Sequence, residues 1–219
     1  DEDHPRFQFM LSWLRRAAEE SKGKSIPAVG AFGGCGDTLA ALRGTERLLY
    51  DVLDRPEQVR DADQCLMEIW CSIYQRFYEI VHDAAEGSTC WFGLWSPGTV
   101  VRNQCDATAF LSADHYAKWF LPYDTRIWKS VDFSIQHIHS NSLHTIDVLL
   151  DRELPHAIQV TLDIQPAGPP VERILPALRK ILTVKPLILE GWLTDDEVRL
   201  VRDELPPDGL SITVRRAPY

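Results

Sequence analysis

The sequence predicts an α/β protein in which parallel strands alternate with helices. Short apolar runs of strand length recur along the chain, and most intervals between them show the 3.6-residue spacing of an amphipathic helix. The chain has 219 residues, of which 45% are hydrophobic and 25% charged, enough for one sizeable core. Because no repeat, low-complexity stretch or flexible linker interrupts the pattern, we expect a single domain over residues 1–219.

The first third of the chain is expected to be mostly helical. Apolar residues at helical spacing predict a helix over 7–20, and the apolar run 26–32 predicts a short buried strand that enters the glycine-rich turn 33–36. Helices are predicted at 45–53 and at 57–85, the second beginning just after a proline, as helices often do.

The remaining two thirds show the strand and helix alternation most clearly. Strands are predicted at 88–94, 100–106, 133–139, 157–162, 186–190 and 211–215. Helices are predicted between most of them, at 113–130, 144–152, 171–183 and 195–205, the last with Thr194 as its N-cap.

Composition excludes several classes of protein. The formal net charge of −9 argues against a nucleic-acid or anionic-membrane surface, because phosphate binding needs clustered lysines and arginines. No apolar run approaches the length of a membrane span, and the acidic start of the chain lacks the apolar region of a signal peptide. The five cysteines show no C-x-x-C spacing, so we expect reduced thiols in a cytoplasmic protein.

Ionisable side chains follow four of the predicted strands at their carboxyl ends. These residues are Asp106, the pair His137 and His139, Asp163, and Glu190. The two histidines are two positions apart on one strand, so they share a face with Cα atoms roughly 6.5 to 7 Å apart and can reach one metal ion or one anion. Parallel sheets carry their chemistry at this edge. The alternative to a functional site is that the two histidines only pack beneath a loop and that Asp163 and Glu190 cap helices or are solvated.

Trp91 and Trp95 lie in an aromatic stretch with turn-forming glycines. They could bind a flat ligand or a partner protein through an aromatic surface. The alternative is that both belong to the core.

Several segments resemble the uroporphyrinogen decarboxylase superfamily, which includes zinc-dependent methyltransferases acting on corrinoid proteins and coenzyme M. The similarity extends over nearly the whole chain. It is carried by the segments 28–34, 42–49, 54–57, 105–112 and 120–123 and by the strand end at 137–140. The resemblance implies a (β/α)8 TIM-barrel type fold. Family barrels are longer, so we expect a barrel lacking its first one or two βα units, either a reduced relative or the C-terminal part of a longer barrel.

The same resemblance implies metal-assisted methyl transfer involving a corrinoid or a thiol acceptor. His137 and His139 stand where the methyltransferases have His-x-Cys. We therefore expect these two residues to bind zinc, with Asp163 or Glu190 completing the coordination shell. Asp106, His137, His139 and Asp163 are the expected catalytic residues.

The resemblance leaves two alternative functions. One is decarboxylation of uroporphyrinogen, in which Asp106 would stabilise positive charge; the arginine-rich motif that binds that substrate has no match here. The other is a non-catalytic barrel that binds a tetrapyrrole or a corrinoid protein. Glu190, Trp91 and Trp95 are the expected substrate-binding residues, and the expected partner is a small molecule or a corrinoid protein. A homodimer is compatible with the sequence, which does not fix the oligomeric state.

Overall fold

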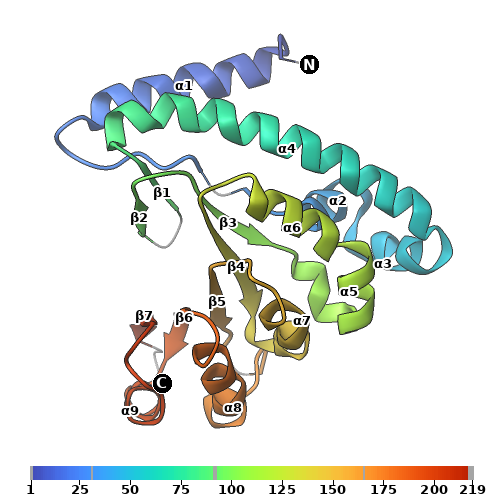
Figure 1. Cartoon of the computed structure of the whole chain (residues 1–219), viewed down its shortest axis with the longest axis vertical. Helices are drawn as coiled ribbons and strands as arrows, with labels where there is room; N and C mark the ends of the chain where they lie inside the picture. The colour runs from blue at the N-terminus through green and yellow to red at the C-terminus, as the bar shows by residue number, and fades with distance from the viewer. Residues whose placement is uncertain (1, 31, 91–92, 165, 217–219) are drawn as a thin grey trace.

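The computed structural model describes residues 2–30, 32–90, 93–164 and 166–216. It shows an α/β fold, as the sequence predicts, built on a parallel sheet with helices around it (Figure 1). Within these residues, no helix combines the length and the apolar character that crossing a membrane requires.

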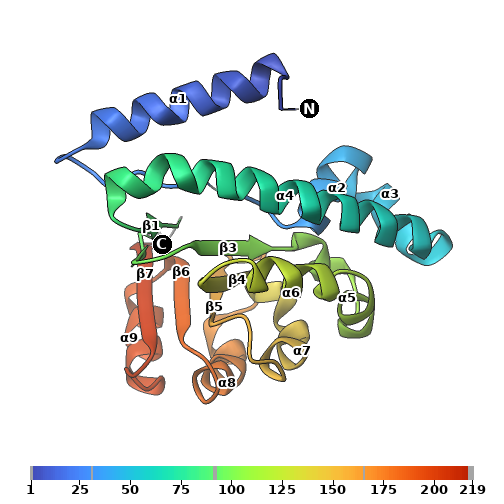
Figure 2. The same ribbon diagram turned by 45° about the horizontal axis from the view of Figure 1, so that its top comes forward.

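Five strands form the main sheet. They are β3 (Val100–Gln104), β4 (Phe133–His139), β5 (Ala157–Leu162), β6 (Leu187–Leu193) and β7 (Leu210–Arg216). All neighbours are parallel, and the order in the sheet is the order in the sequence, β3-β4-β5-β6-β7. The strand direction turns progressively from β3 to β7 (Figure 2). Because β3 and β7 are the first and last strands in this order and do not pair with each other among the described residues, the sheet is open.

Helices connect the strands and cover one face of the sheet (Figures 1 and 2). The connections are α5 (Ala113–Trp119) with α6 (Leu121–Lys129), then α7 (Ile146–Leu150), α8 (Val171–Leu182) and α9 (Asp195–Glu204). Strand residues on this face, such as Ile158, Val160 and Leu189, are fully buried in the main hydrophobic core. Thr194 and Glu197 form a capping box at the start of α9, which confirms the predicted N-cap.

The other face of the sheet is polar toward the carboxyl ends of the strands. Because partners in adjacent parallel strands point to the same side, the register forms two rows across the sheet. The first row contains Gln104, His137 and Gln159, and the second contains His139, Thr161, Glu190 and Thr213.

Apolar residues occupy the amino-terminal end of this face. A small hairpin of β1 (Ser88–Thr89) and β2 (Trp95–Ser96) leads into β3. Cys90, just after β1, packs there with Val100, Ile135 and Ile188. The hairpin therefore closes one end of the face and leaves the polar end open.

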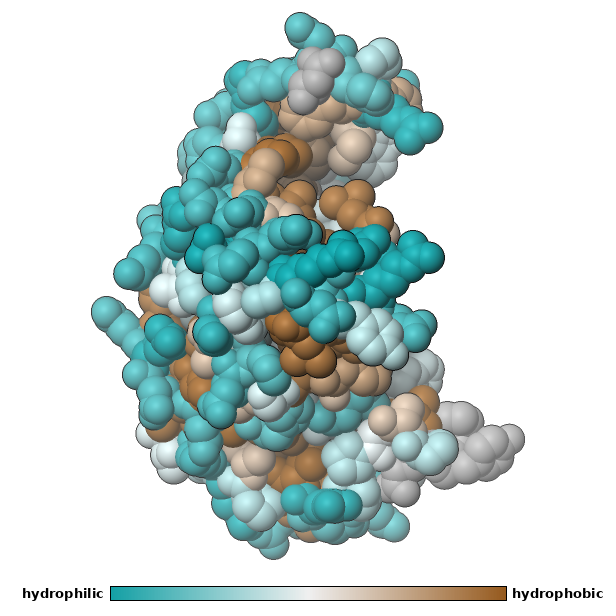
Figure 3. Space-filling view, turned by 90° about the vertical axis from the view of Figure 1, so that its right-hand side faces the viewer, coloured by the Kyte–Doolittle hydropathy of each residue, from teal (hydrophilic) through white to brown (hydrophobic). Residues whose placement is uncertain are grey.

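The N-terminal third is mostly helical, as predicted, but one of its helices, α2 (Cys35–Arg43), is not among the predicted ones. The other helices are α1 (Pro5–Ser21), α3 (Thr45–Asp54) and the long α4 (Pro56–Ala85). The helix α4 packs on α1 and on α6, in a second apolar cluster that includes the stacked rings of Trp70 and Tyr74. Toward the α1 and α4 end of the molecule, exposed apolar side chains gather between hydrophilic ones (Figure 3).

Three predicted elements differ from the structure. Residues 26–32 are not assigned as a strand where they are described, because Pro27 has no N–H to donate and Gly30 has a φ of +109°. The predicted helix 113–130 divides at Phe120, since the ring of Pro122 cannot continue a preceding helix. The predicted strand 88–94 is only two residues long within the described part, and a hairpin partner follows it.

A buried acidic pair lies behind the sheet. Asp63 on α4 and Asp124 on α6 are each 1% exposed. Neither carboxylate oxygen of Asp63 has a hydrogen-bond partner among the described residues, whereas Asp124 accepts a hydrogen bond from the Tyr116 hydroxyl at 2.8 Å. Burial, with a smaller contribution from Asp124, raises the pKa of Asp63 to about 8. Burial also raises the pKa of Asp124 to about 7. Both groups therefore favour their neutral form.

These two acids make stability depend on pH. Each carboxyl group has a higher pKa in the folded than in the unfolded protein. Below about pH 4 this difference leaves the free energy of unfolding unchanged, and as pH rises toward the folded-state pKa it lowers the free energy of unfolding progressively. We expect Asp63→Asn to raise the free energy of unfolding by about 2 to 4 kcal/mol at pH 7 and to reduce the loss of stability between pH 4 and 7 by about half. Urea denaturation across this range measures both effects. The control is Asp61→Asn, at an exposed position two residues earlier on α4. Equal effects in the two variants would contradict the explanation.

Candidate metal centre

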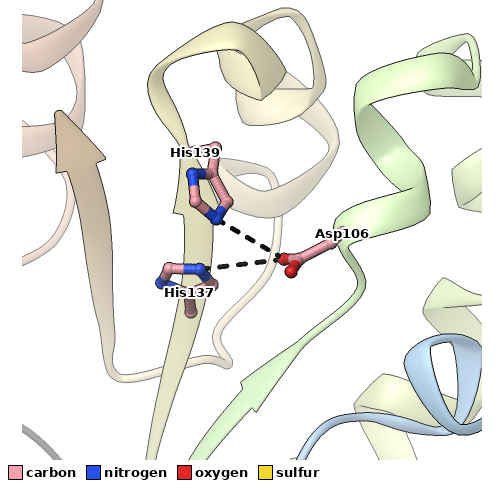
Figure 4. A group of neighbouring side chains, drawn as sticks. All are labelled: Asp106, His137 and His139. Carbon is pink, nitrogen blue, oxygen red and sulfur yellow. Dashed lines mark ion pairs between the residues drawn. The ribbon is translucent and has the colours of Figure 1, made fainter. Parts of the chain in front are cut away.

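Asp106, His137 and His139 form a compact cluster at the carboxyl end of the sheet (Figure 4). The histidines lie on β4, and Asp106 follows β3 at the start of a short 3-10 turn. Asp106 Oδ1 lies 3.7 Å from His137 Nε2 and 4.0 Å from His139 Nε2. One ligand atom from each residue lies within 4.8 Å of the others. Both imidazoles thus direct their Nε2 atoms at one carboxylate oxygen.

A glutamine holds the first imidazole in place. His137 Nδ1 is hydrogen-bonded to Gln159 Oε1 on the neighbouring strand, and Gln159 Nε2 donates to Thr161 Oγ1 at 3.0 Å. In this orientation the Gln159 amide presents its oxygen to His137, so Nδ1 is the ring nitrogen that donates the hydrogen bond. The Nε2 lone pair of His137 is left facing Asp106. Burial and the nearby Arg102 charge lower the pKa of His137 to about 3, so this ring is neutral at physiological pH.

A carboxylate holds the second imidazole. His139 Nδ1 lies 2.8 Å from Asp163 Oδ1, and Ser140 Oγ donates to Asp163 Oδ2 at 2.9 Å. An imidazole whose Nδ1 hydrogen goes to a carboxylate, with its Nε2 turned to a metal, is a recurrent arrangement in metalloproteins that orients the ring and increases its basicity. Asp163 thus orients the His139 ring through Nδ1, on the side away from Asp106.

Two residues position Asp106. Its backbone N–H donates to Asp37 Oδ1 at 2.6 Å, and its Oδ2 accepts a hydrogen bond from Gln104 Nε2 at 3.2 Å. The same Gln104 amide donates to Asp37 Oδ2. Burial and the charge of Asp37 raise the pKa of Asp106, while His139 and Arg102 oppose that rise. The free oxygen, Oδ1, is the one that faces the histidines.

This arrangement leaves acceptors facing one another. With both Nδ1 atoms acting as donors, two nitrogen lone pairs and a carboxylate oxygen converge, and separations of 3.7 and 4.0 Å are too long for direct hydrogen bonds. Ligands about 2.0 to 2.1 Å from a tetrahedral zinc ion lie about 3.3 Å apart. The three ligand atoms, which lie within 4.8 Å of one another, would therefore draw closer together around a bound ion. Two imidazoles and one carboxylate suit zinc or another first-row divalent metal and leave positions open.

A pocket of about 490 Å³ opens in front of the three residues. Its walls include Arg102 on β3, Glu190 and Trp192 on β6, and Arg215 on β7. The side chains of Asp106 and His139 are 47% and 33% exposed, so a small molecule can reach them from the pocket.

The structure brings together most of the residues that the sequence singled out. Asp106, His137, His139, Asp163 and Glu190 all line the pocket. The carboxylate that meets the two Nε2 atoms is Asp106, however, and not Asp163 or Glu190 as expected. The register explains this: Asp106 follows Gln104, the partner of His137, while Asp163 lies two residues beyond Thr161, the partner of His139.

Of the two tryptophans expected to bind substrate, the structure describes Trp95. It lies on β2, in the hairpin at the amino-terminal end of the strands, and it is not among the residues lining the pocket. The hairpin thus places Trp95 at the end of the sheet opposite the metal centre. Trp91 lies outside the described residues.

Sequence reasoning missed the residues that support the cluster. Gln159 could have been found, because period-two alternation places it on the same face as the histidines once the register of β5 is known. Asp37 carried no comparable signal, since its contact with Asp106 joins residues 69 positions apart through the start of α2. Trp192 and Arg215 became apparent only with the pairing of β6 and β7.

Comparison with known proteins assigns no relative to the chain: no family model, curated protein or solved structure matches it. The site is therefore defined by its own geometry.

We expect Asp163→Ala to weaken zinc binding by about 10- to 100-fold, because His139 loses the acceptor that fixes its tautomer and orientation. Asp163→Asn keeps an acceptor oxygen and should lose less. Isothermal titration with Zn²⁺ measures the affinities, with Asp151→Ala, an exposed acid at the end of α7, as the control. An affinity unchanged in Asp163→Ala would show that Asp163 does not support the site.

Proposed function

We propose that this protein is a metal-dependent methyltransferase of the uroporphyrinogen decarboxylase superfamily that transfers a methyl group between a corrinoid and a thiol. Asp106, His137 and His139 hold a divalent metal, most simply zinc. The observation that carries the proposal is the convergence of two Nε2 lone pairs on one carboxylate oxygen, with the hydrogens of both rings directed away.

The fold supports membership of a TIM-barrel superfamily. The parallel strands follow one another in sequence order, and the connecting helices cover one face only. An open doubly wound sheet instead reverses its strand order and carries helices on both faces. The uncovered polar face then corresponds to the inside of a barrel, and the site lies at the carboxyl ends of the strands, where barrel enzymes carry their chemistry.

The chemistry follows from the ligands. A bound metal would lower the pKa of a coordinated thiol so that it is a thiolate at neutral pH. The thiol proton would pass to solvent, the thiolate sulfur would form a bond with the methyl carbon of a methylcob(III)alamin, and the cobalt–carbon electron pair would stay with the corrinoid as cob(I)alamin. Asp106 and the two histidines would hold the metal, and the exposed side of His139 leaves the approach open.

Elemental analysis tests the metal. After purification without chelator, we expect close to one zinc per chain in the wild type and a large loss in both His137→Ala and His139→Ala, because each removes one of three protein ligands. His82→Ala, on α4 and away from the pocket, is the control and should keep its metal. Metal absent from all of these proteins, also after incubation with zinc, would contradict the proposal.

Activity is tested separately on the zinc-loaded protein. Methylcob(III)alamin and a panel of small thiols are supplied without oxygen, and formation of cob(I)alamin is followed by absorbance. The proposal predicts turnover that both histidine variants lose and the control keeps. Stoichiometric zinc without any methyl transfer would retain the metal site and exclude this reaction for the thiols used.

A further inference from the structure

The helix α1 exposes a row of large apolar side chains. Phe9 and Trp13 are 67% and 64% exposed, and Met10 is 48% exposed. These positions are three and four residues apart, so they lie on one face of the helix. A different face, which carries the buried Leu11 and Leu14, packs on α4. Because an exposed apolar row of this size is uncommon on a protein that stays alone in solution, it marks a surface that another molecule covers.

An apolar groove continues this row toward α4. Met10 and Phe7 line it from α1, and Ile69 and Ile73 line it from α4. The groove has a volume of about 670 Å³, and Ile69 is 49% exposed. Apolar residues gather at the same end of the molecule in the space-filling view (Figure 3). We call this surface the α1 face, made of Phe9, Met10, Trp13 and Ile69.

The area of the α1 face suits a small two-fold interface. From the usual sizes of such side chains, its four residues expose roughly 400 Å² of apolar surface per chain. Two copies packed on each other would cover about 800 Å² of it, and the charged residues around the face would bring the total close to the roughly 1,200 Å² of the smallest specific interfaces. An interface of this size is typical of weak, concentration-dependent association.

The charges along α1 favour a second copy of the chain as the partner. Asp3 precedes the helix, and Arg16 lies in its second half. If two α1 helices pack antiparallel about a two-fold axis between Phe9 and Met10, Asp3 of one copy lies at the level of Arg16 of the other. In the single chain Arg16 pairs with Glu20 at 2.8 Å, but both side chains are exposed, and such a pair contributes little. Arg16 is therefore available to a second copy.

The same axis places an arginine over each exposed indole. Arg6 and Trp13 lie equally far from the axis on opposite sides of it, so Trp13 of one copy faces Arg6 of the other. Both belong to the exposed side of α1. A guanidinium over the face of an indole ring is attracted by the ring electrons, and the attraction grows when water is excluded. The two ends of the α1 face thus complement each other when the helices run antiparallel.

A lipid surface suits the α1 face less well. Helices that lie on membranes carry lysines and arginines along their polar side, which bind anionic headgroups. Around the α1 face, Glu2 and Glu68 line the groove, and Asp3 and Glu20 lie toward the two ends of the row. With a formal net charge of −9 on the whole chain, an anionic lipid surface would repel this side of the molecule.

We propose that the protein forms a homodimer through the α1 face, with the two α1 helices antiparallel about a two-fold axis and each copy covering the groove of the other. The inference does not depend on the proposed function. Within the described part of the chain, no residue of the α1 face lines the metal-site pocket. Both metal centres of the dimer therefore remain open.

Sedimentation velocity from low micromolar to several hundred micromolar concentration tests the dimer. We expect a monomer–dimer equilibrium in the wild type. Trp13→Glu should weaken it at least about 30-fold, because a two-fold interface loses the aromatic contact twice. The matched control is Leu53→Glu on α3, which is 63% exposed and lies outside the α1 face; it should dimerise as the wild type does. Circular dichroism and zinc content should be the same in all three proteins.

A charge exchange tests the antiparallel arrangement. Asp3→Arg and Arg16→Asp should each weaken the dimer by about three- to tenfold, because each brings like charges together at both ends of the interface. The double variant carries the exchanged charges in both copies, so it should recover most of the loss. Losses that add up in the double variant would contradict the antiparallel arrangement and overturn the inference.

Three further results would overturn the proposal. One is a wild type that stays monomeric at every concentration, and another is a dimer that Trp13→Glu leaves intact. The third is a dimer that Leu53→Glu weakens as much as Trp13→Glu does. Flotation with phosphatidylcholine and phosphatidylserine vesicles covers the lipid alternative: a monomer that binds vesicles, and loses this binding in Trp13→Glu, would assign the face to a membrane instead.

Discussion

Two hydrogen bonds behind the imidazoles of β4 determine what this site can do. Gln159 and Asp163 each accept the Nδ1 hydrogen of one histidine, so both rings present a bare Nε2 lone pair to Asp106. Neither hydrogen bond would be possible in another register, since Gln159 is the direct partner of His137 and Asp163 follows the partner of His139. Without these contacts the rings could turn or exchange tautomers, and the three ligand atoms would no longer converge.

The rest of the fold keeps these residues in position. Helices bury one face in a continuous apolar core, which fixes the strands and their register. The hairpin closes the amino-terminal end of the other face with apolar contacts, and the polar residues of the site lie toward the carboxyl ends of the strands. Asp37 on α2 accepts hydrogen bonds from the backbone N–H of Asp106 and from the side-chain amide of Gln104. The N-terminal helices thus contribute to the site as well as to the fold.

Sequence reasoning predicted local features well and long-range ones poorly. The alternation over 133–139 gave the bounds of β4 and the shared face of His137 and His139, because side-chain direction in a strand is a local property. The third converging residue was not predictable from the same pattern, since it depends on how β3 pairs with β4. The division of helix 113–130 could have been foreseen from Pro122. The support from Asp37 and Gln159 needed the folded register.

X-ray absorption spectroscopy of the zinc-loaded protein tests the central claim most directly. The first shell should contain two imidazole nitrogens and carboxylate or water oxygens at about 2.0 to 2.1 Å, and no sulfur before a thiol is added. A protein sulfur at about 2.3 Å, or a shell without histidine, would contradict the assignment of Asp106, His137 and His139 as the metal ligands.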